Sequence, residues 1–322
     1  YVRLPLLALL LFGIGLVIAG ARRRGWRQLR QGMVEVARYE WSLGRIIYIA
    51  TGLLTFYVCY VGYRNLKSVL PVYREGALYD RQLLELDRWF FGGADPAFVL
   101  HTVLGTDISA VVLSAVYLAY LPLVPISLGI FLVLSRDVSV GAWYATTLCL
   151  NWVLGVVSYY ILPAVGPIYS RPDLYADLPN TGVTAVQQGL LNNRLEFLTS
   201  PSTSDAIHGV AAFASLHVSV TFAAALFVHY TVQSRIVRFA GWGFFALTSV
   251  ATIYFGWHYV VDNIAGMAIG WAAVAIGAWA TGITPEKRKQ LRESPVLGVD
   301  APEEELTEEA EAGSVGSAAA RP

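Results

Sequence analysis

The feature that most constrains this chain is a series of long apolar runs that carry no Asp, Glu, Lys or Arg. Crossing the hydrocarbon core of a bilayer as a helix takes about 20 mostly apolar residues. Seven runs of roughly that length occur, some with flanking loop: 4–20, 46–63, 108–135, 138–170, 206–234, 239–261 and 263–285. Charged residues make up 14% of the chain, against about a quarter in soluble proteins. The sequence therefore predicts an all-α polytopic bundle of six to seven transmembrane helices.

The chain divides into three regions by composition. Residues 1–40 hold the first run and a basic connection, and the absence of an Ala-x-Ala cleavage site favours a retained span over a signal peptide. Because the chain does not begin with Met, we expect a trimmed start. Residues 41–282 form the predicted catalytic bundle. Residues 283–322 are rich in Glu, Ala, Gly and Ser without aromatic residues, which predicts a disordered tail.

The distribution of positive charge predicts the orientation in a cell membrane. If the seven spans alternate, four basic clusters fall on one side: residues 22–30, Arg136, Arg235 with Arg238, and residues 287–292. The positive-inside rule makes that side, and the C-terminal tail, cytoplasmic. Five cations between residues 64 and 88 oppose this, but they lie in a long connection that also holds acids. The net charge is zero, which predicts no nucleic-acid partner.

Residues 79–91 carry an amphipathic pattern that predicts a helix lying in the membrane interface. An ordinary loop helix packed on the bundle explains the same pattern. The two cysteines, Cys59 and Cys149, lie inside apolar runs and are expected to be packing residues.

Three ionisable residues lie near the predicted outer ends of spans: His217, His258 and Asp262. Such groups cost roughly 2.5–3.5 kcal/mol at mid-bilayer and usually serve function. His258 and Asp262 are four residues apart, so a helix beginning near Trp257 would place them on one face. A carboxylate that fixes the imidazole tautomer leaves the other nitrogen free to act as a nucleophile. A structural His–Asp pair at a helix start is the alternative.

Two further segments could supply phosphate ligands. Ser215 is a candidate N-cap, and a helix start presents free N–H groups to an anion, with His217 placed to protonate a leaving oxygen. A cap beside a buried core histidine is the alternative. Gly166 and Pro167 end the fourth span, and Arg171 follows at the same interface, where it could clamp a phosphate or merely contact lipid headgroups.

These residues resemble motifs of the type 2 phosphatidic acid phosphatase superfamily, in particular its branch similar to inositol phosphorylceramide synthases. The second motif usually reads Pro-Ser-x-His, and residues 214–217 read Ala-Ser-Leu-His. The third ends in His-x3-Asp, matched by His258 and Asp262. The turn at Gly166 looks like that branch's first motif. The resemblance covers residues 80–280.

The resemblance implies a metal-independent phosphotransferase or lipid phosphate phosphatase that needs no cofactor. His258 would form a phosphohistidine, Asp262 would orient it, and His217 would protonate the leaving alkoxide. The phosphate oxygens would be held by Ser215, Arg171, Gly166 and backbone amides. The donor would be a phospholipid or polyprenyl phosphate at the extracytoplasmic face, and the group moved would be phosphoryl or phospho-alcohol, such as phosphoinositol.

The sequence departs from the superfamily pattern at three points. Ala214 replaces the Pro of the second motif, and Ala251 with Thr252 replaces the Ser-Arg pair of the third. The first motif, Lys-x6-Arg-Pro, retains Arg171-Pro172 but has Ala164 in place of Lys. Fewer cations are therefore expected around the phosphate than the superfamily usually provides.

Two other functions fit the same residues. A proton-coupled transporter could use the His and Asp residues as a relay, although they gather at one face and no inverted repeat is evident. Alternatively, His217, His258 and Asp262 are suitable ligand types for zinc. The sequence does not specify an oligomeric state.

Overall fold

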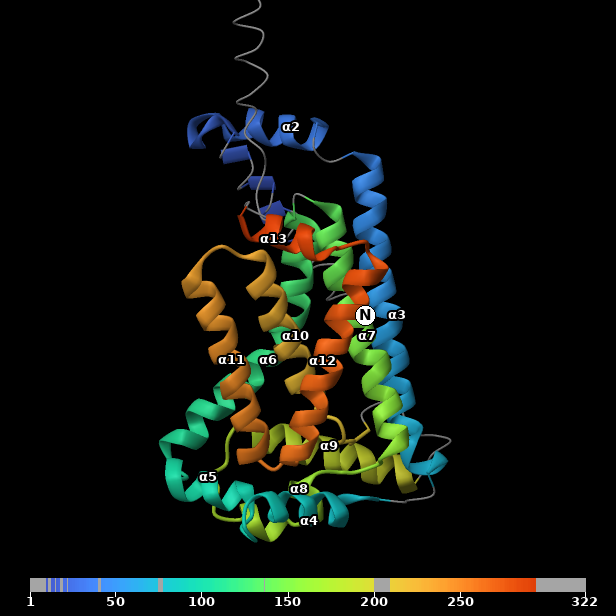
Figure 1. The fold of residues 1–322 in the computed structure, drawn as a ribbon, viewed down its shortest axis with the longest axis vertical. Coiled ribbons are helices and arrows are strands. Elements are labelled where there is room, and N and C mark those ends of the chain that lie inside the picture. Colours follow the sequence, from blue (N-terminus) through green and yellow to red (C-terminus); the bar gives the residue numbers. More distant parts are fainter. Residues whose placement is uncertain are drawn as a thin grey trace, which may run out of the picture.

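The computed structural model describes residues 42–74, 78–135, 137–199 and 209–293, together with residues 10, 13–14, 16–17, 20–21 and 23–39. These residues form twelve α-helices, two short 3-10 helices and no β-strand. The helices of the bundle run roughly parallel to its long axis, and shorter helices lie across both of its ends (Figure 1). The predicted all-α fold is confirmed.

Five of the predicted spans form helices long and apolar enough to cross a membrane. They are α3 (Leu43–Tyr73), α6 (Ile108–Leu134), α7 (Val138–Ile161), α11 (Arg235–Tyr254) and α12 (Val260–Ala280). The run 206–234 gives α10 (Leu216–Thr231), which is apolar but shorter. The first run, 4–20, lies largely outside the described residues. The chain is thus a multi-pass membrane protein.

Helix α3 is longer than the sequence predicted. The apolar run ends at Tyr63, but the helix continues past Arg64 and Lys67 to Tyr73. At about 1.5 Å per residue, its 31 residues span roughly 46 Å, whereas the hydrocarbon core is about 30 Å thick. The last turns of α3 therefore extend to the membrane boundary, where a cation on the helix is tolerated.

The centre of the bundle is formed by α7, α10 and α12, which pack closely together. Glycines on α12 allow this approach, since a Cβ built on Gly270 would lie 2.5 Å from the carbonyl oxygen of Ser219 on α10. Small residues at helix interfaces are typical of membrane bundles. In lipid the hydrophobic effect does not favour helix association, so dispersion contacts between closely spaced backbones stabilise the pair instead. A buried aromatic group, which includes Trp143, Tyr144 and Phe227, fills the core beside them.

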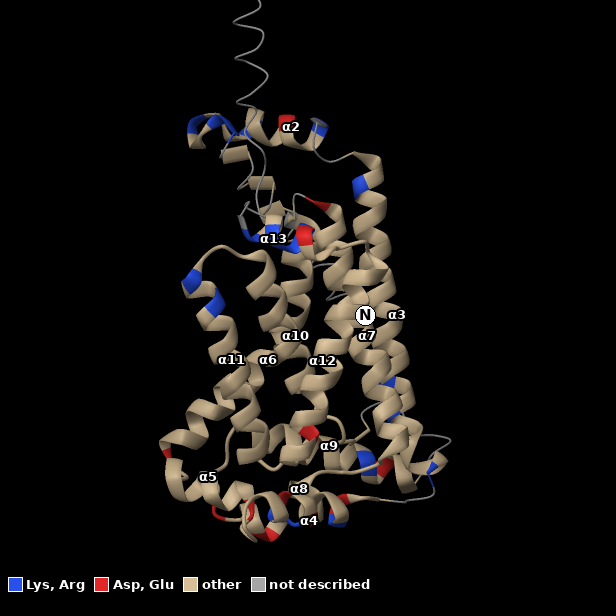
Figure 2. Ribbon diagram, viewed as in Figure 1, with Lys and Arg blue, Asp and Glu red and all other residues tan. Residues whose placement is uncertain are grey.

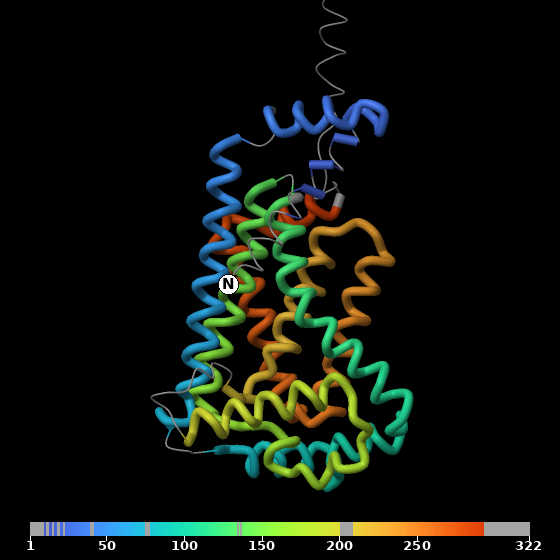
Figure 3. The backbone as a smooth tube through the Cα atoms, turned by 180° about the vertical axis from the view of Figure 1, so that it is seen from behind, coloured from blue at the N-terminus to red at the C-terminus, as the bar shows by residue number. Residues whose placement is uncertain are grey.

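The two ends of the bundle carry different helices. At the end drawn lowest in Figure 1, four helices lie across the bundle: α4 (Asp80–Phe90), α5 (Pro96–Leu104), α8 (Pro167–Ser170) and α9 (Gly182–Thr199). Figure 3 shows α9 and α4 crossing this lower end from behind. At the opposite, upper end lie α2 (Leu29–Tyr39) and α13 (Pro285–Glu293).

The basic clusters of the described residues gather at the upper end, as the charge pattern predicted. Lysines and arginines of α2, α13 and the start of α11 lie there (Figure 2). Arg136 lies outside the described residues. The region 283–322, expected to be disordered, begins with helix α13, and residues 294–322 lie outside the described part of the chain.

Candidate active site

The two histidines singled out from the sequence meet at the lower end of the bundle. His217 is the second residue of α10, and His258 lies in the short connection between α11 and α12. Their ring centroids are 5.8 Å apart, and the ring planes are inclined by 57°. One imidazole from the start of α10 and one from the loop before α12 therefore lie side by side.

Asp262 stands beside His258, as the four-residue spacing predicted. The distance from His258 Nδ1 to Asp262 Oδ2 is 3.4 Å, and both side chains are buried. Helix α12 begins at Val260, with Tyr259 as N-cap, so the expected start near Trp257 was wrong and His258 precedes the helix. The N–H of Tyr259 donates to the same Oδ2 at 3.0 Å, which holds the carboxyl against the loop that carries His258.

The environment of His258 favours the neutral ring. Burial lowers the pKa of His258, the positive charge of Lys67 on α3 lowers it further, and a backbone contact with Ala212 opposes them. A neutral imidazole has a lone pair available for attack, whereas an imidazolium does not. The loop therefore keeps His258 in the form that a nucleophile needs at neutral pH.

Helix α6 holds His217 between two aromatic rings. The ring centroid of His217 lies 4.6 Å from that of Tyr117 and 4.5 Å from that of Tyr120. Tyr117 in turn stacks on Trp257, with centroids 5.3 Å apart and nearly parallel planes. This stack links α6 to the loop of His258. Sequence reasoning missed both tyrosines, because nothing in the apolar run of α6 marks which of its aromatic residues face the site.

Ser215 is the N-cap of α10, which confirms the expectation from the sequence. Its Oγ accepts from the N–H of Val218 at 3.4 Å, and the residue is fully buried. Its own N–H donates to the carbonyl oxygen of Asp262 at 3.0 Å. The start of α10 is thereby joined to the first turn of α12, which fixes His217 relative to the His–Asp pair.

Gly166 brings the end of α7 against the loop of His258. Its φ is +93°, a conformation that favours glycine. A Cβ at this position would lie 2.5 Å from the carbonyl oxygen of Trp257, the residue before His258. The N–H of Ile168 also donates to the Gly256 carbonyl at 2.8 Å. Gly166 therefore permits close contact between two loops of the site.

We expect Gly166→Ala to lower kcat/KM by about a hundredfold, because the new methyl group must push the Trp257 carbonyl and with it His258. Gly189→Ala is the matched control, since a Cβ on Gly189 in α9 meets nothing within 4 Å. Steady-state kinetics on both purified variants would check the prediction. Equal activity of the two would show that this contact does not position His258.

Arg171 lies at the same end but is engaged elsewhere. Its guanidinium forms two hydrogen bonds with the carboxylate of Asp173, at 3.0 Å and 2.8 Å, on the exposed side of the turn after α8. The structure therefore places it near the site without directing it toward the histidines. The sequence could have indicated this ion pair, because Asp173 follows Arg171 by two residues in a turn that contains Pro172.

Two buried carboxylates of α4, missed by sequence reasoning, organise the loops around the histidines. Asp80 accepts from the N–H groups of Val165 and Gly166 and from the hydroxyl of Tyr259, at 2.8–3.2 Å. Asp87, two turns further along the same face of the helix, accepts from the N–H groups at the start of α12, at 2.7 Å and 3.1 Å. The amphipathic pattern of α4 thus marks packing on the bundle as well as an exposed apolar edge.

Asp87 makes a pH dependence of stability testable. Burial, followed by neighbouring carboxylates, raises the pKa of Asp87 to about 6 from 3.8, against the effect of its two backbone hydrogen bonds. The folded state therefore binds the proton more readily than the unfolded state between these values, so Asp87 contributes more stability as pH falls from 7 to 4.

We expect the melting temperature of the parent protein, relative to that of Asp87→Asn, to rise as the pH falls from 7 to 4. Melting curves at several pH values would measure the difference. Glu85→Gln on the exposed side of α4 is the control and should follow the parent. A constant difference between the parent and Asp87→Asn would contradict the raised pKa.

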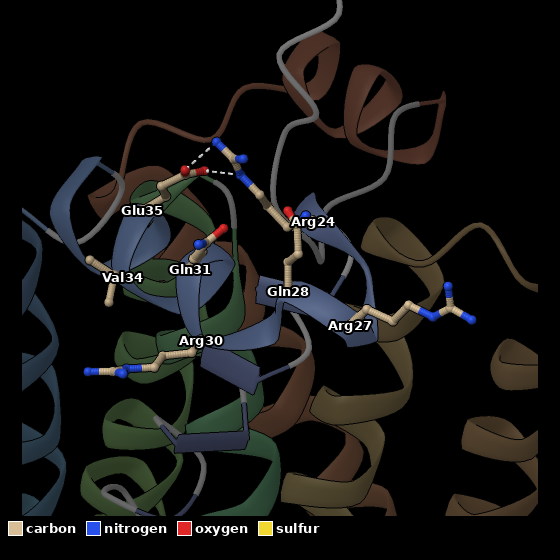
Figure 4. A pocket seen from close by; sticks show the side chains of 7 residues that line it. All are labelled: Arg24, Arg27, Gln28, Arg30, Gln31, Val34 and Glu35. Atoms are coloured by element: carbon tan, nitrogen blue, oxygen red, sulfur yellow. Dashed lines mark hydrogen bonds and ion pairs between the residues drawn. The ribbon is translucent and has the colours of Figure 1, made fainter.

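One hollow of the surface lies at the upper end of the bundle, away from the histidines. Figure 4 shows it, lined by the polar face of α2 and the residues just before it: Arg24, Arg27, Gln28, Arg30, Gln31, Val34 and Glu35. Arg24 pairs there with Glu35 at 2.6 Å. Within the described residues, no group of three or more His, Cys, Asp or Glu side chains is arranged to hold a metal ion.

The fold and the site define a multi-pass membrane protein with two histidines and an aspartate gathered at one end of its bundle. The sequence profile of the PAP2 superfamily matches residues 81–276, more than half of the chain. The chain therefore belongs to the PAP2 superfamily, whose members are phosphatases or phosphotransferases acting on phosphorylated lipid-type substrates. No curated protein and no solved structure matches it.

Proposed function

We propose that this protein moves a phosphoryl or phospho-alcohol group from a lipid donor to water or an alcohol through a phosphohistidine on His258. The observation that carries the proposal is the meeting of His217, His258 and Asp262, with ring centroids 5.8 Å apart and the His–Asp pair at 3.4 Å. Phosphoryl transfer needs an in-line nucleophile and acid together with charge neutralisation, and this arrangement offers the first two.

In the first step, Nε2 of neutral His258 attacks phosphorus while Nδ1–H faces Asp262. The bond from phosphorus to the ester oxygen breaks, and protonated His217 gives its proton to the departing alkoxide. In the second step, His217 takes a proton from water or an alcohol, whose oxygen displaces the imidazole from phosphorus. The second step regenerates both histidines, and the acceptor alone decides between hydrolysis and transfer.

The phosphate oxygens would be held by groups around the histidines. Ser215 and Gly166 border the site, although the N–H of each is already engaged, by Asp262 and by Asp80. Arg171 stays a proposed phosphate ligand, and it would have to leave Asp173 to act as one. None of these groups therefore supplies an unengaged positive charge to the phosphate.

The orientation is part of the proposal. The basic clusters at the upper end favour a cytoplasmic upper end, and the histidines would then lie at the extracytoplasmic face. There the donor would be a phospholipid or a polyprenyl phosphate. The resemblance to inositol phosphorylceramide synthases favours a polyol such as inositol as acceptor.

A donor panel tests the proposed function. Purified protein in detergent micelles would be offered phosphatidic acid, phosphatidylinositol and a polyprenyl phosphate, each with and without inositol or glycerol. We expect phosphate release or a new phospho-alcohol from at least one donor, without added metal. Failure with every donor, combined with pH-driven uptake into proteoliposomes that Asp262→Asn abolishes, would favour the transporter instead.

A further inference from the structure

The last turns of α3 bring a lysine to the histidine site from outside the region that matches the superfamily. Lys67 Nζ lies 5.3 Å from the ring centroid of Tyr159 on α7 and 5.8 Å from that of Tyr63. It also lies 3.4 Å from the hydroxyl of Tyr63. These contacts hold the ammonium between α3 and α7 instead of letting it extend into lipid.

The segment that leads into α10 passes directly over Lys67, since a Cβ built on Gly209 would collide with the Lys67 carbonyl oxygen. Three residues before His217, the N–H of Ala214 donates to Ser158 on α7, the neighbour of Tyr159, at 2.9 Å. Tyr159, over which the ammonium lies, is buried in the core beneath the site. Helix α3 packs along α7, whose end leads into the turn at Gly166. Lys67 therefore belongs to the same end and the same side of the bundle as the proposed phosphate.

Within the described part of the chain, Lys67 has no acidic partner, whereas other cations at this end of the bundle do. Arg88 pairs with Asp95, and Arg171 pairs with Asp173. Among the described residues, no carboxylate forms an ion pair with Lys67. A half-buried ammonium without an anion pays a desolvation cost that a bound phosphate would offset.

The sequence has no cation at the lysine position of the superfamily's first motif. Ala164 stands where the superfamily's first motif has its lysine, and its methyl group cannot bind an anion. Arg171, the remaining cation of that motif, is held by Asp173. A cation that neutralises the transferred group is needed in any case, because charge on the phosphoryl oxygens dominates the transition state.

We propose that the Lys67 ammonium binds a non-bridging oxygen of the substrate phosphate, so that α3 supplies the cation which the first motif lacks. This inference rests on the proposed function. It adds a binding residue at position 67, beyond the matched residues 81–276. The alternative is a lysine that reaches only toward lipid headgroups at the membrane boundary.

Inorganic orthovanadate, an anion of the shape of phosphate, is a suitable probe. Its binding to the purified full chain can be followed by the rise in melting temperature as its concentration increases. We expect the apparent Kd to increase about 10- to 100-fold in Lys67→Met, as for the loss of one charge-assisted hydrogen bond. Lys67→Arg, which keeps the charge, should restore most of the affinity.

Arg64→Gln is the matched control, since Arg64 lies one turn earlier on α3, over the ring of Tyr60. We expect its vanadate affinity to stay within about twofold of the parent value. The melting temperature without vanadate reports whether Lys67→Met folds, and Lys67→Gln serves as a second neutral variant if it does not.

The outcomes separate the two proposals. If the parent binds vanadate and turns over a donor, but Lys67→Met and Lys67→Gln bind vanadate as tightly as the parent, the lysine faces headgroups only and the inference is wrong. If the parent neither binds vanadate nor releases phosphate from any donor, the proposed function fails and the inference falls with it. An equal loss in Arg64→Gln would reduce the effect to general surface charge and also overturn the inference.

Discussion

Replacing His258 with alanine should lower kcat/KM by at least about a thousandfold for every donor that the protein turns over. The imidazole is the proposed nucleophile, and alanine leaves no group at this buried position, 4% exposed, that can attack phosphorus. Because the loss concerns bond formation to phosphorus, the leaving group should not matter. Turnover measured on an alkyl and an aryl phosphate would show the same large reduction.

The control for this variant is another histidine of the same helix bundle. His229 lies near the end of α10 that faces the basic upper end, beside Tyr230 and Trp242, and the proposed mechanism does not use it. His229→Gln should keep kcat/KM within about twofold of the parent. If His258→Ala melts like the parent yet retains a tenth of its activity, His258 is not the nucleophile.

The second large effect is expected for His217→Gln, and it should depend on the leaving group. A general acid contributes about 10²–10⁴-fold when the departing oxygen is basic. An alkoxide from a lipid alcohol needs that proton, whereas p-nitrophenolate leaves without it. We therefore expect a loss of about a thousandfold for a dialkyl or monoalkyl phosphate and a loss of less than about tenfold for p-nitrophenyl phosphate.

The dependence of the loss on the leaving group distinguishes a role of His217 in proton transfer from a role in packing. His217 is also part of an aromatic stack with Tyr117 and Tyr120, so its replacement could disturb the site without any role in proton transfer. A purely structural loss would lower the turnover of both donors by the same factor. Equal losses would therefore contradict the assignment of His217 as general acid.

The spans could be predicted from the sequence because each is a local property of composition. Apolar runs located α3, α6, α7, α11 and α12. The end of α3 was missed because Arg64 and Lys67 interrupt the run, although a helix that extends beyond the hydrocarbon core accommodates them. Residues whose partners lie far along the chain leave no local pattern, so the sequence cannot show them.

The residues of the site likewise fall into two groups, those marked by a local sequence pattern and those whose partners lie far along the chain. The spacing of His258 and Asp262 and the cap at Ser215 are local, and the structure contains both arrangements. The carboxylates of α4 are different, since Asp80 reaches groups 85 or more residues away. In the sequence of an amphipathic helix, such buried acids have the same pattern as acids on a solvent-exposed face. Only the fold shows that they bind the loops on which the site depends.

The most direct test of the central claim is to trap the phosphoenzyme. Donor labelled with ³²P in the transferred group would be mixed with purified protein, quenched in alkali within milliseconds, and the label located by peptide mass spectrometry. The proposal predicts an acid-labile, alkali-stable label on the peptide that contains His258, which is absent from His258→Ala. Label on another residue, or turnover by the parent without any trapped label under the same conditions, would contradict it.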